Sequence, residues 1–217
     1  MKVLVTGSSG DIGKAIVKRF VSSGHQVIGI DKQGSPFTLD GYTHITADLT
    51  ASLPDMDGLE VIVACHGVQL PDEETIEVNL SSTIDLLEKY ALQPAIKAVV
   101  TIASASGRNG AEFPRYAASK GGLIAYTKNL ALRLATFGAT ANSISPGGVV
   151  TRSNAVVVDD PKLYREVLDE SLLGKWCDPD EIAEWVYFVA VVNKSMTGED
   201  LLIDNGEMLK SNFVWPR

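Results

Sequence analysis

Short runs of β-branched and apolar residues alternate with longer helical patterns along the whole chain. Several of the short runs are apolar at nearly every position, such as Val61–Ala64 and Ala98–Ile102. A strand that is apolar on both sides is covered on both faces, as in a parallel sheet. Because strands that alternate with helices imply right-handed crossovers, we predict an α/β fold with a doubly wound parallel sheet of about seven strands.

One connection in this pattern is unusually short. Only about Thr50–Gly58 separates the third expected strand from the fourth, so the crossover helix after the third strand is largely missing. The expected strands are Lys2–Thr6, Gln26–Ile30, Thr43–Ala47, Leu59–Cys65, Lys97–Ala103, Ala139–Ser145 and Asp200–Ile203. The expected helices are Asp11–Ser23, Asp72–Ala91, Pro114–Phe137 and Pro179–Val192. A chain of 217 residues, 45% of them hydrophobic, can bury one core, so we expect residues 1–217 to form a single domain.

A glycine-rich loop, Thr6 to Gly13 (TGSSGDIG), joins the first expected strand to the first helix. Glycines in this place permit a tight turn and let backbone N–H groups approach a pyrophosphate, and the helix N-terminus adds partial positive charge. The position after the first strand favours a Rossmann-type dinucleotide-binding domain over a turn that merely opens a helix. The residues expected to contact the cofactor here are Gly7, Ser9, Asp11, Ile12 and Gly13.

Two acidic residues follow the second and third strands. Asp31 is placed to accept both hydroxyls of an adenosine ribose and to repel a 2′-phosphate, which favours NAD(H). Lys32 could neutralise such a phosphate, so NADP(H) stays open, and a solvated turn acid is the alternative reading of Asp31. We expect Asp48, followed by Leu49, to meet the adenine edge.

Tyr116 and Lys120 are four residues apart on an expected helix, so their side chains share one face. Lowering a tyrosine pKa from near 10 to about 7 requires about 4 kcal/mol. An ammonium at around 4 Å supplies roughly that much at an effective dielectric of 20. This spacing is common by chance, but Ser104 and Ser106 end the preceding strand at the same edge of the sheet. The pair is therefore a plausible acid/base unit.

Taken together, these motifs resemble the short-chain dehydrogenase/reductase family from Lys2 to about Gly206. The resemblance implies a catalytic set of Asn79, Ser104, Tyr116 and Lys120. In that family, Tyr116 would exchange a proton with the substrate, Lys120 would hold the nicotinamide ribose and Asn79 would position a water. The cofactor contacts implied beyond those above are Cys65, Gly67, Tyr116, Lys120, Pro146, Gly147, Val149 and Thr151.

The chain departs from the family pattern in the short connection after the third strand, in Asp204-Asn205-Gly206 where Asp-Gly-Gly is usual, and in three places nearer the site. Asp11 replaces the middle glycine of the loop, where we expect it to crowd the pyrophosphate. The residues Ala64 to Gly67 (ACHG) replace the usual Asn-Asn-Ala-Gly, and His66 is either a structural histidine or a contact to cofactor or substrate. Ser104 lies one residue closer to Tyr116 than usual, which leaves Ser106 as a possible substitute.

The resemblance implies an NAD(H)-dependent oxidoreductase that interconverts a secondary alcohol and a ketone, with a substrate lid at about residues 149–175. In the lid, Arg152 and Arg165 could meet an anionic group. A dinucleotide-binding sensor or scaffold without turnover is the alternative, and an epimerase or dehydratase of the same fold is a third. The resemblance also implies a homodimer or homotetramer.

Charge and cysteine content bear on partners and compartment. Nineteen Lys and Arg against 27 Asp and Glu give a net charge of −8, which argues against nucleic acid and membrane surfaces as partners. Cys65 and Cys177 are too few for a disulfide framework. No residue cluster indicates a metal site, and no apolar run is long enough to span a bilayer. We expect a cytoplasmic protein.

Overall fold

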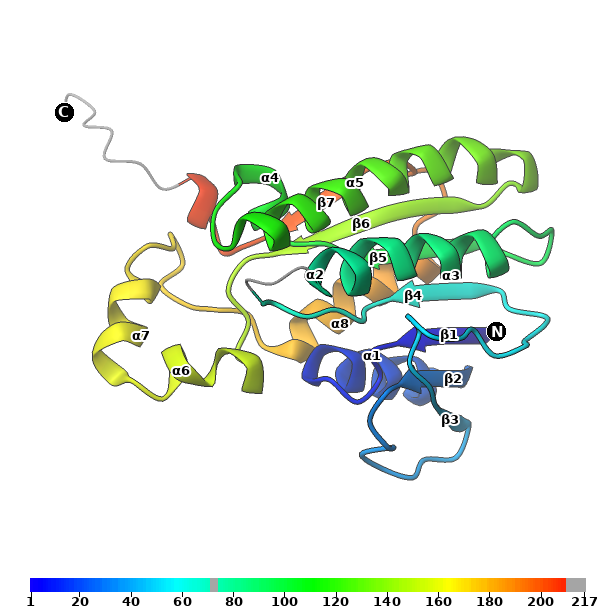
Figure 1. Ribbon diagram of the computed structural model, residues 1–217, viewed down its shortest axis with the longest axis horizontal. Helices are drawn as coiled ribbons and strands as arrows, with labels where there is room; N and C mark the ends of the chain where they lie inside the picture. The colour runs from blue at the N-terminus through cyan, green and yellow to red at the C-terminus, as the bar shows by residue number, and fades with distance from the viewer. Residues whose placement is uncertain (71–73, 210–217) are drawn as a thin grey trace.

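Seven parallel strands form one sheet in the order β3-β2-β1-β4-β5-β6-β7 in the computed structural model (Figure 1). The structure describes residues 1–70 and 74–209. The strands are β1 (Lys2–Thr6), β2 (Gln26–Asp31), β3 (Tyr42–Thr46), β4 (Val61–Ala64), β5 (Ala98–Ile102), β6 (Thr140–Pro146) and β7 (Asp200–Ile203). All seven expected strands are confirmed, with ends that differ by no more than two residues. The predicted single α/β domain with a Rossmann-type sheet is therefore correct.

Helices cover both faces of the sheet. On one face α1 (Asp11–Ser22) and α8 (Pro179–Tyr187) pack side by side, and Phe20 and Val186 are fully buried between them and the strands. On the other face lie α3 (Ser82–Tyr90) and α5 (Pro114–Leu134), with Leu86 and Leu130 fully buried. This two-sided cover explains why β4 and β5 are buried at every position.

The expected helices are present with altered ends. A short α2 (Glu74–Ile76) and a π-helical turn, η1 (Glu77–Ser81), precede α3, and Asp72, the expected start, lies outside the described residues. A 3-10 turn, η2 (Ala135–Phe137), ends α5, and a second π-helical turn, η4 (Phe188–Val192), ends α8. A final 3-10 turn is η5 (Glu207–Leu209).

The connection between β3 and β4 contains no helix in the described structure, as predicted. An irregular segment with one turn at Asp48–Ser52 fills the place of that helix, and Leu59 is fully buried in the core beneath α3. The chain is fastened to α3 by Lys89 Nζ, which donates to Leu53 O at 2.8 Å, and by the Tyr90 hydroxyl, which donates to Pro54 O. The core is therefore closed on this side without a crossover helix.

The remaining helices lie at the carboxyl edge of the sheet. α4 (Ser106–Asn109) follows β5, and η3 (Arg152–Asn154), α6 (Ala155–Val158) and α7 (Pro161–Leu168) follow β6. Figure 1 shows α6 and α7, in yellow, standing apart from the sheet. Neither helix has a fully buried residue, so this segment packs loosely on the body of the domain.

We predict that Leu59→Ala lowers the free energy of unfolding by about 2–5 kcal/mol, because it leaves a cavity under α3. Urea denaturation followed by circular dichroism measures this change. Leu132→Ala is the control, since Leu132 is 77% exposed and should change stability by less than about 0.5 kcal/mol. A small effect at both positions would show that the β3–β4 connection is not part of the core.

Candidate active site

The carboxyl ends of β4, β5 and β6 converge on the N-terminal half of α5, which carries Tyr116 and Lys120. Pro114 is the first residue of α5, where its missing N–H costs no hydrogen bond. Lys120 is buried, and its Nζ donates to Ile102 O, at the end of β5, at 2.8 Å. The same ammonium lies 5.8 Å from the centroid of the Tyr116 ring. The predicted pair therefore shares one face of the helix, as expected.

Burial determines the protonation of both residues. It lowers the pKa of Lys120 to about 8, because a charged ammonium is disfavoured away from water. Burial also raises the pKa of Tyr116, and the hydrogen bond with Ser104 opposes this only in part. We expected Lys120 to lower the pKa of Tyr116; in the free protein burial is the largest effect, and the pKa of Tyr116 is raised overall. Tyr116 is protonated at neutral pH.

Ser104 supplies the hydroxyl that contacts Tyr116. Its Oγ also accepts from the backbone N–H of Ser106 at 3.2 Å, which fixes the side chain at the end of β5. Ser106 begins α4 and is buried. Of the two serines left open by the sequence, Ser104 is the one that interacts with Tyr116.

Asn79 is fully buried in η1, and its side chain fastens the loop after β4 to α5. Its Oδ1 accepts from Val68 N at 2.7 Å, and its Nδ2 donates to Val68 O at 2.8 Å and to Ser119 Oγ at 3.1 Å. Gly67 lies against this amide and against Lys120, so that a Cβ there would come within 3.0 Å of Asn79 Oδ1. Asn79 thus supports the site, and its role in positioning a water stays a prediction.

We expected His66 to be either a structural histidine or a contact to cofactor or substrate, and its hydrogen bonds are those of a structural histidine. Its Nδ1 lies 2.6 Å from Thr6 Oγ1, and its Nε2 lies 2.9 Å from Ser82 Oγ and 3.2 Å from Thr83 Oγ1. Both ring nitrogens are therefore engaged within the protein, and burial lowers the pKa of His66 to about 4. The neighbouring Cys65 thiol is also un-ionised, because burial raises its pKa to about 12.

The glycine loop has the form that a dinucleotide pyrophosphate requires. Gly7 has a φ of +65°, and a Cβ on Gly13 would lie 2.0 Å from Gly7 O, so the helix start packs directly on the loop. Within the described residues, the backbone N–H groups of Asp11, Ile12 and Gly13 donate no hydrogen bond. These free donors at the start of α1 fit an anionic group.

Asp31 closes the other end of the predicted cofactor site. Its Oδ2 accepts from Ser9 N at 3.0 Å and its Oδ1 from Gln33 N at 2.9 Å, so the carboxylate is fixed beside the glycine loop. Lys32 is exposed next to it. Asp48 is also exposed, and its Oδ1 accepts from the backbone N–H of Thr50 at 2.9 Å in a turn. Leu49, in contrast, points into the core.

The segment after β6 returns across the same edge of the sheet. Pro146 ends β6, and a Cβ on Gly147 would lie 2.8 Å from Asp204 Cβ, which leaves room only for glycine. Val149 is buried and pairs with Cys177 in a parallel bridge, which joins the two ends of the segment that carries α6 and α7. Thr151, directly before η3, is half-buried at the mouth of the glycine loop.

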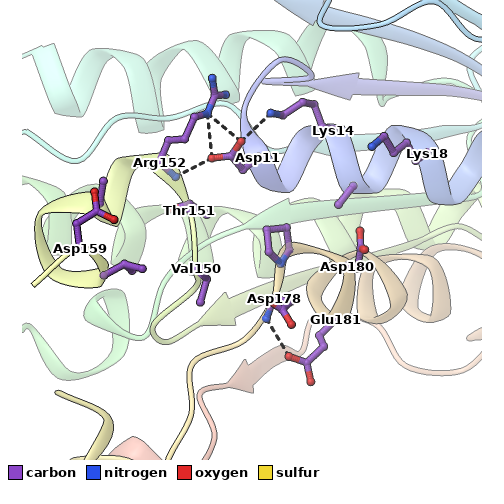
Figure 2. Close-up of a pocket in the computed structure, with 14 residues that line it drawn as sticks. Asp11, Lys14, Lys18, Val150, Thr151, Arg152, Asp159, Asp178, Asp180 and Glu181 are labelled. Atoms are coloured by element: carbon purple, nitrogen blue, oxygen red, sulfur yellow. Dashed lines mark hydrogen bonds and ion pairs between the residues drawn. The ribbon is translucent and has the colours of Figure 1, made fainter. Parts of the chain in front are cut away.

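Two contacts in this region were not anticipated from the sequence. Asp11 is bound by Arg152, from the far side of the edge, and Figure 2 shows the two side chains pointing toward each other above a pocket. In addition α4 packs on α5 through glycines, because a Cβ on Gly107 would lie 2.7 Å from the Lys120 carbonyl carbon and one on Gly121 3.1 Å from Gly107 O. The adjacent glycines Gly121 and Gly122 in the Tyr116 helix were the available signal for close packing.

Other kinds of site find no support in the described structure. Within residues 1–70 and 74–209, no three His, Cys, Asp or Glu residues are grouped so that they could hold a metal ion. In the same residues no helix combines the length and apolarity needed to cross a membrane.

A seven-stranded parallel sheet with a glycine loop and a Ser-Tyr-Lys group at its carboxyl edge defines an oxidoreductase with an NAD(P)-binding Rossmann-type fold. Family models for enoyl-(acyl carrier protein) reductase and for the NAD-dependent epimerase/dehydratase family match residues 70–207 and 3–120. The chain belongs to the short-chain dehydrogenase/reductase family.

Individual relatives agree with this assignment. The chain is 33% identical to L-fucose dehydrogenase of Mus musculus, over 95% of this chain and 88% of the relative. It is 29% identical to the 3-oxoacyl-[acyl-carrier-protein] reductase FabG of Salmonella typhimurium, over 94% and 95% of the two chains. A short chain dehydrogenase family protein of Francisella tularensis superposes with a TM-score of 0.83 at 27% identity, covering 96% of this chain and 99% of that one.

We predict that Lys120→Met stabilises the free protein more at pH 7 than at pH 10. The wild type carries the full cost of a buried ammonium below the folded pKa of about 8, and this cost fades as pH rises toward the unfolded value of 10.5. The stability difference between variant and wild type should therefore shrink by about 2 kcal/mol from pH 7 to pH 10.

Urea denaturation at the two pH values measures this difference. Lys128→Met, at an exposed position of the same helix, is the matched control and should show no such change with pH. An equal pH dependence in the two variants would show that the Lys120 ammonium is not desolvated.

Proposed function

We propose that the protein is an NAD(H)-dependent oxidoreductase that interconverts a secondary alcohol and a ketone. The observation that carries the proposal is the group formed by Tyr116, Ser104 and Lys120 beside free backbone donors of the glycine loop. A nicotinamide dinucleotide, when bound, supplies or accepts the hydride. The chain itself then has to hold the substrate oxygen and move one proton.

Tyr116 is the group that moves the proton. In reduction the neutral phenol donates its proton to the carbonyl oxygen of the substrate, and in oxidation it has to recover a proton from the alcohol. Because burial raises the pKa of Tyr116, the free protein holds the form needed for reduction. Ser104, which already contacts the phenol hydroxyl, donates a second hydrogen bond to the reacting oxygen and stabilises charge that develops there.

Lys120 lies one helical turn from Tyr116 and acts through its ammonium group. Its ammonium has a single protein acceptor among the described residues, Ile102 O, and therefore keeps hydrogen-bonding capacity for a ribose hydroxyl. With a pKa of about 8, it remains mostly protonated at neutral pH. The positive charge then favours release of the tyrosine proton in the oxidative direction.

The substrate pocket is bounded by the lid that we propose for residues 149–175. The lid presents exposed apolar side chains at Val156, Leu163, Leu172 and Leu173. Cyclopentanol dehydrogenase, whose name specifies a secondary alcohol, and a 3-oxoacyl reductase, whose name specifies a ketone, are both relatives and support this substrate class. We further propose a homodimer or homotetramer, for which Trp185 and Phe188, both more than 40% exposed on adjacent turns, offer apolar contact area.

We predict that Tyr116→Phe lowers kcat by about 10²–10⁴-fold, because the proton donor is lost, while NADH still binds. A panel of alcohols and ketones read by NADH absorbance identifies a substrate, and fluorescence titration measures NADH affinity. Tyr126→Phe, on the same helix but bonded to Glu88 at 2.7 Å, is the control and should keep full activity. If Tyr116→Phe retains turnover, Tyr116 is not the proton donor. If the wild-type protein binds NADH but turns over no member of the panel, the alternative of a dinucleotide-binding sensor or scaffold is favoured.

We predict that wild type prefers NAD(H) over NADP(H) in kcat/KM and that Asp31→Asn moves this ratio at least about tenfold toward NADP(H), since a full charge beside the ribose is removed. Asn retains an acceptor for one of the two backbone N–H groups that Asp31 binds. Asp40→Asn, at an exposed position, is the control. A wild-type preference for NADP(H) would overturn the role given to Asp31 and point to Lys32 as a phosphate contact.

A further inference from the structure

We propose that Arg152 exchanges its ion pair with Asp11 for the pyrophosphate of the bound dinucleotide, so that this pair sets cofactor affinity. The inference rests on the proposed function, because it concerns the same cofactor site. Asp11 and Arg152 are the first residues of α1 and η3, the helical elements that follow β1 and β6, and these two strands lie three positions apart in the sheet. Their contact therefore spans the carboxyl edge at which the glycine loop opens (Figure 2).

The contact is made by several bonds. Asp11 Oδ2 accepts from the backbone N–H of Arg152 at 2.7 Å, and Oδ1 accepts from its Nε at 3.0 Å. Arg152 Nη2 donates to Ser9 O at 3.1 Å, so the guanidinium lies directly over the glycine loop. Within the described residues Arg152 Nη1 donates no hydrogen bond, which leaves one end of the guanidinium available to a ligand.

A carboxylate at Asp11 competes with a phosphate for the same place. Asp11 is the first residue of α1, where the partial positive charge of the helix start attracts any anion. The free N–H groups of Ile12 and Gly13 lie beside it. A pyrophosphate bound to these donors would meet the negative charge of Asp11 unless a cation lay between the two. Arg152, which pairs with Asp11 in the free protein, lies over the same loop and can supply that cation.

Release of Arg152 does not leave Asp11 without a counter-charge. Lys14 Nζ lies 2.7 Å from Asp11 Oδ1, one helical turn further along α1, and this second ion pair is independent of the segment after β6. The two cations hold the pKa of Asp11 below its usual value, against the effect of burial. Asp11 therefore stays a carboxylate when one of its cations moves.

Arg152 has the freedom to move. Its side chain is 69% exposed, whereas that of Asp11 is 17% exposed. A pocket of about 730 Å³ borders the pair and is lined by α1, by residues 150–159 and by the start of α8. Figure 2 shows Arg152 on the rim of this pocket, with Lys14 and Lys18 along one wall. The guanidinium can thus turn from Asp11 toward a phosphate without unpacking the core.

The test measures the affinity of purified variants for NADH and for ADP-ribose, which contains the pyrophosphate but no nicotinamide. We expect Arg152→Gln to weaken the binding of both ligands about tenfold at low salt and to reduce its dependence on salt, because one phosphate contact is lost. We expect Asp11→Asn to strengthen binding at least about threefold, because the competing charge is removed. These opposite changes in affinity distinguish the exchange from a fixed Asp11–Arg152 ion pair that has to stay intact for the dinucleotide to bind.

Three further measurements keep the test decisive. Lys162→Gln, a charge-matched change at an exposed position on α7 of the same lid, should leave affinity unchanged. Thermal melts confirm that each variant folds, and Arg152→Lys, which keeps the charge without the planar group, should give an intermediate affinity if Arg152→Gln does not fold.

The outcomes separate the inference from the proposed function. Wild type that binds neither NADH nor NADPH would overturn the proposed function itself. If wild type binds and both Arg152→Gln and Asp11→Asn weaken binding, the pair is a fixed clamp and the exchange is wrong. If neither variant shifts affinity by more than about twofold, Arg152 does not contact the pyrophosphate, and the exchange is equally wrong.

Discussion

The buried ammonium of Lys120 is the constraint on which the candidate site depends. It is held against Ile102 O at the end of β5, so its position is fixed by the sheet rather than by an exposed helix surface. Gly67 lies against this ammonium, and α4 packs on the backbone of Lys120. A cation kept away from water at this cost in stability is consistent with selection for function instead of for folding.

Much of this arrangement could be predicted from the sequence. Apolar runs and helical periodicity give all seven strands, because a parallel sheet buried on both faces leaves a strong pattern. The short connection after β3 was also readable, since the expected strands left only about Thr50–Gly58 between them, which is room for a loop or one turn. The site residues Ser104, Tyr116 and Lys120 were placed together by the rule that loops after parallel strands meet at one edge.

What could not be predicted depends on side-chain geometry across long sequence distances. Lys120 was expected to act on Tyr116, but its direction toward Ile102 O is visible only once β5 and α5 are packed. The ion pair between Asp11 and Arg152 joins residues 141 positions apart, and neither residue carries a local signal of the other. The sequence was compatible with either a structural role or a ligand contact for His66. In the structure its ring nitrogens lie against the hydroxyls of Thr6 and Ser82, which is the structural role.

The parallel bridge between Val149 and Cys177 has a consequence for how such a domain can diversify. The bridge joins the two ends of the segment that carries α6 and α7, and neither of these helices has a fully buried residue. Insertions, deletions or replacements within this segment would leave the Val149–Cys177 bridge in place, and therefore also the sheet and Tyr116. A lineage built on this scaffold can thus alter which molecules it admits while Tyr116, the proton donor that we propose, is inherited in place.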